Sequence, residues 1–177
     1  QGMKDVPNPS ELFLSQTPST TLGAGSTQLT GSVTVCTMEG TRPILAEIQA
    51  LVASSKLVMP RRVASGVDYN RLQLILAVLQ KRLGLPLYEC DVYLNVAGGL
   101  KIDEPACDLA IALAIISSFK NKPLSRRLCA VGEIGLLGEL RRVGSLEKRI
   151  KEAKRLGYIN IISSQQYSSI VEASKNI

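Results

Sequence analysis

Histidine and tryptophan are absent from this sequence, and aromatic residues make up only 4% of its 177 residues. Without histidine, the chain has no Ser-His-Asp or Cys-His catalytic group, no histidine-ligated metal and no histidine pH switch. The scarcity of aromatic rings leaves few side chains to stack on nucleic-acid bases. Since hydrophobic residues still make up 45% of the chain, we expect a globular core built from Leu, Ile, Val and Ala.

The sequence also lacks long apolar runs and closely spaced cysteines. No stretch of about 18 apolar residues is present, so we expect no membrane span, and the polar N-terminal residues are not expected to be a signal peptide. The four cysteines, Cys36, Cys90, Cys107 and Cys129, form no C-x-x-C pair, and we expect no metal site. We interpret them as buried, reduced thiols of a reducing compartment. Pairing into two disulfides is the alternative.

The chain divides into a lead-in and a domain. Residues 1–31 hold three prolines and then a Ser/Thr/Gly-rich stretch, which is typical of a linker. Only Leu12, Phe13 and Leu14 are expected to dock there. We therefore predict a linker over 1–31 and one domain over 32–177.

The hydrophobic pattern of the domain predicts strands interspersed with helices. Alternation indicates strands, and apolar residues at i, i+3, i+4 and i+7 indicate helices. Asp68 is the expected cap of the first helix and Gly84 its stop. The order corresponds to an α+β (α/β) domain of two layers. The expected strands cover 32–38, 43–52, 91–97, 128–132 and 158–162, a loop covers 54–66, a hairpin or bulge covers 134–140, and helices cover 68–83, 105–118 and 146–156, with a weak helix at the end.

Three sequence blocks stand out as a set: D-V-Y-L-N-V-A-G-G with D-E-P-A-C-D (91–99 and 103–108), G-E-I-G-L-L-G-E (132–139) and V-G-S-L-E-K (143–148). Their order and spacing resemble the peptidase domain of the Lon proteases. In that family a serine opens a helix whose N–H groups stabilise an oxyanion. A lysine of lowered pKa takes the serine proton in place of a histidine.

The two catalytic positions of that family are changed in this chain. Aligned on the motifs, the serine position holds Ala106 and the lysine position holds Glu147. Alanine has no nucleophilic atom and glutamate cannot replace the lysine, so the resemblance implies a catalytically degenerate domain that is not an enzyme. The alternative is an active peptidase with displaced residues, in which Cys107 or Lys148 would act.

Further motifs are E-G-T-R-P (39–43), P-R-R (60–62), G-V-D-Y-N-R-L (66–72) and V-P-N-P-S-E-L-F-L (6–14). Together with the strand at 91–99, they resemble the C-terminal domain of the RadA family (also called Sms), which are DNA repair and recombination ATPases of bacteria and plant organelles. The resemblance implies a Lon-like fold of the ribosomal-protein domain-2 type. It also implies a homohexameric ring and single-stranded or branched DNA as partner.

The resemblance to the RadA family also has implications for cofactors and for the location in the cell. The chain has no G-x-x-x-x-G-K-[ST] loop, so no cofactor is expected in it. ATP, magnesium and zinc are expected only in parts of such a protein that lie outside this chain. The implied location is the bacterial cytoplasm, or a plastid or mitochondrion if the source is a plant.

The net charge of +6 fits a partner rich in phosphate. We predict sequence-independent contacts with the DNA backbone, with the three cations of the first helix exposed. For the helix at 146–156, the alternative is a solvated face paired with Glu147 and Glu152. In a ring, Glu104, Asp108 and Glu133 would meet arginines of the next subunit. A protein-interaction platform without DNA contact is a further alternative. The hypothesis rests on basic residues that also include Lys151, Lys154 and Arg155 of the helix at 146–156. The nine candidate DNA-binding residues are Arg61, Arg62, Arg71, Lys81, Arg82, Arg141, Arg142, Lys148 and Arg149.

Overall fold

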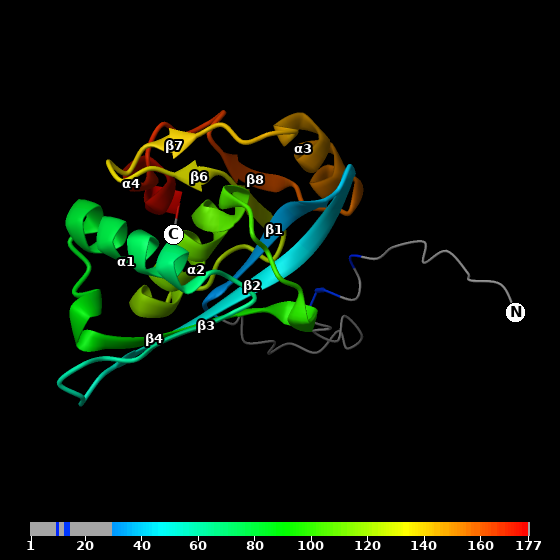
Figure 1. Ribbon diagram of the computed structural model, residues 1–177. Helices are drawn as coiled ribbons and strands as arrows, with labels where there is room; N and C mark the ends of the chain where they lie inside the picture. Colours follow the sequence, from blue (N-terminus) through cyan, green and yellow to red (C-terminus); the bar gives the residue numbers. More distant parts are fainter. Residues whose placement is uncertain (1–9, 11–12, 15–29, 177) are drawn as a thin grey trace, which may run out of the picture.

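The structure is a computed structural model that describes residues 10, 13–14 and 30–176 (Figure 1). Most of the predicted linker over 1–31, including Leu12, lies outside the described residues. The elements are β1 (Ser32–Glu39), β2 (Arg42–Ser54), β3 (Arg62–Ser65), α1 (Tyr69–Leu83), β4 (Cys90–Val96), α2 (Asp108–Lys120), β5 (Leu128–Val131), β6 (Glu133–Ile134), β7 (Leu140–Arg141), α3 (Leu146–Arg155), β8 (Asn160–Ser163) and α4 (Ile170–Ala173).

A six-stranded mixed sheet organises the domain, in the order β3-β4-β2-β1-β5-β8. β1 and β2 form the predicted antiparallel hairpin, and β2 also pairs with β4 in antiparallel fashion. β3, β5 and β8 join as parallel strands. A separate two-stranded hairpin, β6 with β7, confirms the hairpin expected over 134–140.

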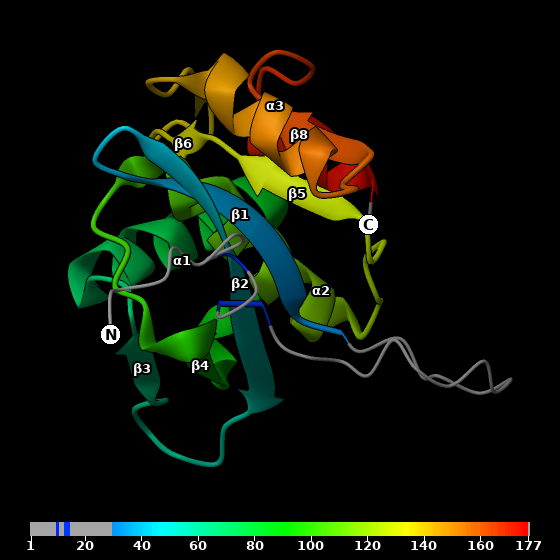
Figure 2. The ribbon, with the colours of Figure 1, turned by 90° about the vertical axis from the view of Figure 1, so that its right-hand side faces the viewer.

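Helices pack on both faces of this sheet, so the two-layer expectation needs a correction (Figure 2). Alternate residues of the strands face opposite ways. In β5, Ala130 joins the larger core with α1 and α2, whereas Cys129 joins a smaller core beneath α3. α3 thus forms a third layer behind β1 and β5. The structure remains consistent with the predicted α+β class. Two of its helices, α1 and α3, are amphipathic, and α2 is buried along most of its length.

The two central helices follow their sequence signals. The Asp68 side chain accepts a hydrogen bond from Arg71 N and caps α1, and Gly84 ends it in the left-handed conformation. The first turn at Pro105 is a short 3₁₀ segment (Pro105–Cys107) that continues into α2. Ten consecutive residues of α2, from Asp108 to Ser117, are buried. α2 is therefore the hydrophobic centre of the domain, and its N-terminal end lies inside the molecule.

Part of the lead-in docks on β2. β4 pairs with β2 only from Ile48 onward, which leaves earlier N–H groups of β2 without a strand partner on that side. Leu45 N donates to Ser10 Oγ at 3.0 Å, and Glu47 N donates to Phe13 O at 3.0 Å. Ser10 is buried, and Phe13 and Leu14 pack against the two cores. The docking expected for Phe13 and Leu14 is confirmed.

Residues 54–66 contain more structure than the predicted loop. Arg62–Ser65 form β3, the edge strand next to β4. Only the segment between β2 and β3 is a loop, and it projects beyond the rest of the domain (Figures 1 and 2). All four cysteines are buried and unpaired, which confirms the interpretation as free thiols. Among the described residues, no helix combines the length and the apolar character that a bilayer span requires.

Candidate functional site at the start of the central helix

Ala106, at the position of the nucleophile in the Lon motif, is closed off from solvent. Only 2% of the residue is exposed. Gly132 N donates to Ala106 O, and Leu109 N donates to Gly132 O, both at 3.0 Å, so the strand end after β5 lies directly against this turn. The methyl group belongs to the small core under α3. This position supplies packing and no reactive atom.

The neighbouring thiol is not an activated nucleophile. Cys107 is buried, and its Sγ donates to Glu104 O at 3.0 Å. Burial, with the adjacent Asp108 and Glu104 carboxylates, raises the pKa of Cys107 to about 12. Burial likewise raises the pKa of Cys36 to about 12. Since the thiolate is the nucleophilic form, these groups stay protonated near neutral pH.

Glu104 and Arg149 form a buried ion pair beside Ala106. Arg149 donates to both Glu104 oxygens at 2.6 Å, and also to Cys36 O at 2.7 Å and Gly144 O at 2.9 Å. Glu104 further accepts from Thr37 Oγ1 at 2.7 Å and Met38 N at 3.0 Å. The pair therefore joins α3, β1 and the start of α2.

These hydrogen bonds determine whether Glu104 is ionised. Burial acts to raise its pKa, but the hydrogen bonds from Arg149, Thr37 and Met38 outweigh burial, and the pKa of Glu104 lies below its usual value. A bidentate arginine fork is the strongest common partner for a carboxylate. The pair is thus ionised and fully hydrogen-bonded at neutral pH.

A second buried pair, Arg71 with Asp108, lies on the other side of the α2 terminus. Asp108 is inaccessible to solvent and accepts from Arg71 Nε at 2.7 Å, from a second Arg71 nitrogen and from Ile134 N at 3.0 Å. The hydrogen bond to Asp108 raises the pKa of Arg71, whereas burial raises that of Asp108. We describe the pair as ionised because arginine keeps its charge and Asp108 receives three hydrogen bonds.

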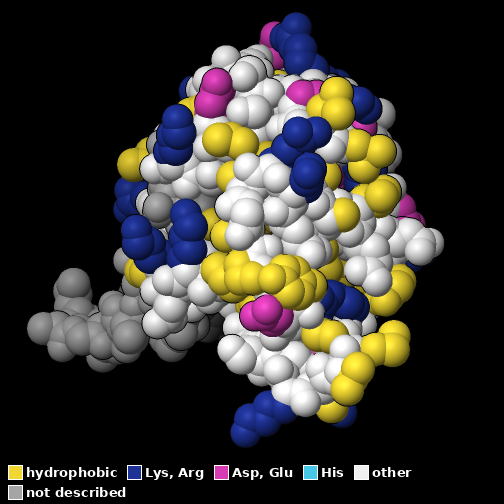
Figure 3. Space-filling model, turned by 90° about the vertical axis from the view of Figure 1, so that its left-hand side faces the viewer, with side chains coloured by type: hydrophobic (Ala, Val, Ile, Leu, Met, Phe, Trp, Pro, Cys, Tyr) yellow, Lys and Arg dark blue, Asp and Glu magenta, His cyan; other side chains and the backbone are white. Residues whose placement is uncertain are grey.

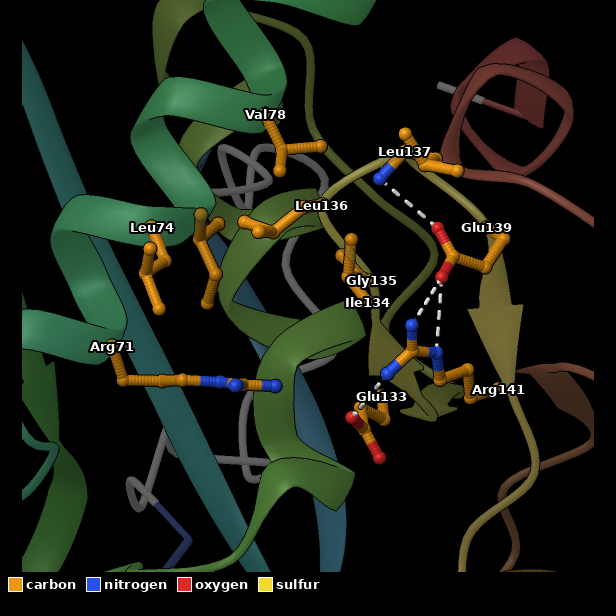
Figure 4. Close-up of a pocket in the computed structure, with 11 residues that line it drawn as sticks. Arg71, Leu74, Val78, Glu133, Ile134, Gly135, Leu136, Leu137, Glu139 and Arg141 are labelled. Carbon is orange, nitrogen blue, oxygen red and sulfur yellow. Dashed lines mark hydrogen bonds and ion pairs between the residues drawn. The ribbon is translucent and has the colours of Figure 1, made fainter.

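Arg71 separates two cavities. One, of about 260 Å³, is lined by Val67, Glu104, Cys107 and neighbours at the start of α2. The other, of about 240 Å³, lies between α1 and the β6–β7 hairpin (Figure 4). The Arg71 guanidinium points toward the hairpin in that view.

Four of the nine candidate DNA-binding residues form ion pairs or hydrogen bonds with other groups of the same chain. Arg71 and Arg149 pair with Asp108 and Glu104. Arg71 is only partly exposed, so the expectation that it is exposed is wrong, and Arg149 has almost no accessible surface for a phosphate. Arg62 donates to the carbonyls of Leu87, Cys90 and Arg61. The fourth, Arg141, pairs with Glu139 and Glu133.

The same contacts give three acidic residues partners within their own chain, while their contact with a neighbouring subunit stays a prediction. Glu104, Asp108 and Glu133 were candidates for arginines of a neighbouring subunit. Each of the three has an arginine of its own chain within ion-pair distance. Their charges are balanced locally because the chain brings α1, α3 and β7 around the α2 terminus.

The remaining five candidates, Arg61, Lys81, Arg82, Arg142 and Lys148, are exposed. Lysine and arginine side chains also stand out on the face of the molecule that carries α1 (Figure 3). Glu147 is exposed in the first turn of α3, and Glu152 pairs with Arg155, as the alternative for this helix expected.

The exposed lysines of α3 form a row that we call the α3 cationic row: Lys148, Lys151 and Lys154. None of the three takes part in an ion pair within the described part of the chain. Two further exposed arginines, Arg126 and Arg127, lie just before β5, where Arg127 O accepts from Asn160 N at the start of β8. The candidate set missed these two. Their signal is the absence of any acidic residue between Asp108 and Glu133.

Among the described residues, no group of three His, Cys, Asp or Glu side chains is placed to hold a metal ion. With Ala106 inert and the thiols protonated, the α2 terminus offers two balanced ion pairs and two cavities. Its residues can bind and position. They include no nucleophile and base in contact with each other.

Comparisons with known proteins show which family the chain belongs to. A family model described as subunit ChlI of Mg-chelatase matches residues 70–167. Proteins named DNA repair protein RadA are similar over most of the chain. The one from Bacillus subtilis (strain 168) is 51% identical over 92% of the chain, and the one from Streptococcus pneumoniae (strain ATCC BAA-255 / R6) is 52% identical over 90%.

The relative from Listeria monocytogenes is 49% identical over 90% of the chain. The chain spans only about a third of the length of these relatives: 34%, 36% and 33%, respectively. The chain therefore belongs to the family described as subunit ChlI of Mg-chelatase, and about nine-tenths of it is homologous to part of the bacterial proteins named DNA repair protein RadA.

Proposed function

We propose that this chain is a non-proteolytic, Lon-like domain of a RadA-type DNA repair and recombination protein. In this role it serves as a homohexameric ring scaffold and as a sequence-independent surface for single-stranded or branched DNA. It needs no cofactor for this role, and ATP, magnesium and zinc would be bound by other parts of such a protein. The proposed location is the bacterial cytoplasm.

The α2 terminus supports the proposal that this domain is not a peptidase. Ser-Lys chemistry needs a hydroxyl at the helix start and an amine that can take its proton. Ala106 is a buried methyl, and the buried guanidinium of Arg149 pairs with Glu104, two residues before it. The former catalytic region thus acts as a structural junction between α2, α3 and β1.

The observation that carries the DNA part is the α3 cationic row with Arg126 and Arg127. Contacts with phosphates need accessible cations and no base-reading groups. A lysine that is exposed and lacks an acidic partner can release counterions from DNA, whereas a cation already balanced by a carboxylate gains less. The row and the exposed Arg61, Lys81, Arg82 and Arg142 meet this requirement, and the four engaged arginines do not.

Fluorescence anisotropy of labelled single- and double-stranded oligonucleotides tests this proposal, repeated from low to physiological salt. We expect affinity to fall linearly in a plot of log K against log salt. Each lost phosphate contact should lower the slope by about 0.7 for single strands and about 0.9 for duplex. The triple variant Lys148→Ala/Lys151→Ala/Lys154→Ala should therefore bind more weakly and with a shallower slope.

The matched control is Lys101→Ala, which removes an exposed lysine that pairs with Asp103 at 3.1 Å. It should leave the slope unchanged. Absence of salt-dependent binding by a folded wild-type chain would refute the DNA surface. Cleavage of labelled casein that survives Cys107→Ala and Lys148→Ala would refute the non-proteolytic assignment.

A further inference from the structure

Three residues of the lead-in, Ser10, Phe13 and Leu14, form a small docked unit on β2, which we call the latch. Figures 1 and 2 show them as short dark-blue pieces beside β2. Phe13 N donates to Ser10 O at 3.1 Å, so two of the three residues are also hydrogen-bonded to each other. The latch therefore docks as one unit.

The latch completes one edge of β2. This strand pairs with β1 along one edge and with β4 along the other, and the pairing with β4 begins only at Ile48. The N–H groups of Leu45 and Glu47, two residues apart, point to the same edge. They donate to Ser10 Oγ and Phe13 O, each at 3.0 Å. The latch thus supplies the acceptors that a neighbouring strand would supply.

The latch also touches both hydrophobic cores. Phe13 packs against the larger core, whereas Leu14 packs against the smaller core beneath α3. The smaller core includes Leu146 and Ala153 of α3 itself. Ser10 is buried, at 1% exposure, while Phe13 and Leu14 keep part of their surface in solvent. Undocking of the latch therefore removes apolar contacts from the core that α3 covers.

The attachment of the latch is weak compared with the pairing of the sheet. Its described residues accept the two hydrogen bonds from β2 given above. In contrast, β2 pairs with β1 over residues 42–49 and with β4 over residues 48–54. Segments with few buried contacts open at a lower free energy than the whole domain. The latch therefore meets the condition for an opening that leaves the sheet intact.

We propose that the latch undocks and redocks as a unit while the sheet stays folded, and that its state is transmitted to α3 through Leu14. In the docked state, Leu14 completes the smaller core, and α3 is held against β1 and β5. In the undocked state, this core is open on one side and α3 moves more freely. The α3 cationic row then loses its fixed arrangement, so the latch regulates the proposed DNA surface. Only this last step rests on the proposed function.

Amide hydrogen exchange, measured for each residue of the whole chain by NMR, tests the docking equilibrium. Leu45 and Glu47 donate to the latch, whereas Ala46, between them, is paired with Val35 of β1. We expect Leu45 and Glu47 to exchange by local opening, roughly tenfold or more faster than Ala46. Equal protection of the three amides would overturn the inference, because this edge would then open only together with the sheet.

Removal of one acceptor from the latch gives a second test. Ser10→Ala should raise exchange at Leu45 and Glu47 roughly threefold to tenfold, as expected for the loss of one hydrogen bond. The matched control is Ser118→Ala, because Ser118 Oγ accepts from Val52 N of the same strand at 2.9 Å. The control should raise exchange at Val52 and leave the other two amides unchanged. Equal effects of both variants on Leu45 would contradict the latch.

Leu14→Ala tests the transmission to α3. It should speed amide exchange in α3 about threefold or more, as expected for a truncated apolar contact, and change α1, which packs on the larger core, much less. Since coupling between two sites is reciprocal, a short oligonucleotide bound by the α3 cationic row should slow exchange at Leu45 and Glu47. Oligonucleotide binding without this protection would overturn the link between latch and α3. No binding, with the expected exchange pattern, would refute the DNA surface alone.

Discussion

At the scale of single residues, Arg149 has the largest structural role at the α2 terminus. Its side chain is 4% exposed and pairs with Glu104, whose side chain is 28% exposed. Removing one member of a buried pair leaves the other charge without compensation, which costs about 3–5 kcal/mol. Because the Glu104 side chain is partly in contact with solvent, we expect Arg149→Met to lower the free energy of unfolding by less than this amount but by more than about 1 kcal/mol, the upper value for an exposed pair, measured by urea denaturation.

A matched control on the same helix is Arg155→Met, because Arg155 pairs with Glu152 at 2.7 Å on the surface, with 58% of its side chain exposed. This change should cost about 0–1 kcal/mol. The double variant Arg149→Met/Glu104→Gln should recover part of the loss. Equal effects of the two arginine substitutions would contradict the structural role of the buried pair.

The lowered pKa of Glu104 predicts a pH dependence. Because its folded-state pKa lies below the usual 4.5, Glu104 contributes stability above about pH 4.5. This contribution is lost as the pH falls through the folded-state pKa. Urea midpoints measured between neutral and acidic pH should therefore fall more steeply in the wild type than in Glu104→Gln. Parallel curves would show that Glu104 is not the group responsible.

Residue identities show that the two catalytic positions of the Lon motif are changed, but they do not show the contacts made around these positions. Ala106 and Glu147 can be recognised as inert positions from the motifs alone. Arg71 and Arg149 cannot be distinguished from surface cations in the same way. Their partners, Asp108 and Glu104, lie 37 and 45 residues away, and nothing local to either arginine reports the distant carboxylate.

At the scale of elements, local signals placed most helices and strands correctly. The cap at Asp68 and the stop at Gly84 bound α1 as expected, since both act within one turn of the helix. β3 was missed because its four residues carry no long alternation. Its strand character comes from hydrogen bonding to β4, which begins 25 residues later.

Gly66, between β3 and α1, provides a test at this scale. It has φ +81°, and an added Cβ would lie 2.5 Å from Leu100 O and 2.7 Å from Val96 Cβ. Gly66→Ala should cost about 3 kcal/mol or more, since the left-handed conformation and the overlap both oppose it. Thermal and urea unfolding measure the loss.

The control for this change is Gly40→Ala in the β1–β2 turn. Gly40 also has a positive φ, of +60°, but an added Cβ would meet nothing within 4 Å. This variant should lose only the conformational part, about 1–2 kcal/mol. If Gly66→Ala were no worse than Gly40→Ala, the close packing between β3 and the end of β4 would not be needed for stability.

At the scale of the whole molecule, the domain separates its stabilising charges from its accessible ones. Both arginine–carboxylate pairs lie at the α2 terminus, while the α3 cationic row is exposed. Linking several weak sites in one assembly raises apparent affinity without any new contact. In the proposed ring, the α3 cationic rows of several copies would therefore bind one long DNA more tightly than a single copy does.

This effect is measurable. If the chain forms the proposed ring, it should bind long single-stranded DNA about a hundredfold more tightly than an oligonucleotide that covers one site, the lower end of typical avidity gains. Anisotropy with short and long DNA measures the difference. Equal affinity for both lengths would contradict a multivalent assembly.

The amino-acid sequence alone predicted the β1–β2 hairpin, the caps of α1 and the burial of α2, because each depends on residues close together in the chain. It also showed the changed residues at the two peptidase positions, because each is the identity of a single residue. Strand order, the third layer formed by α3, the pairing of Arg71 and Arg149, and the cavity under the β6–β7 hairpin depended on contacts between distant segments. The sequence alone does not distinguish a basic side chain that faces solvent from one that pairs with a carboxylate. Only packing places the partner beside it, and this is why four of the nine candidate DNA-binding cations proved to be engaged within the chain.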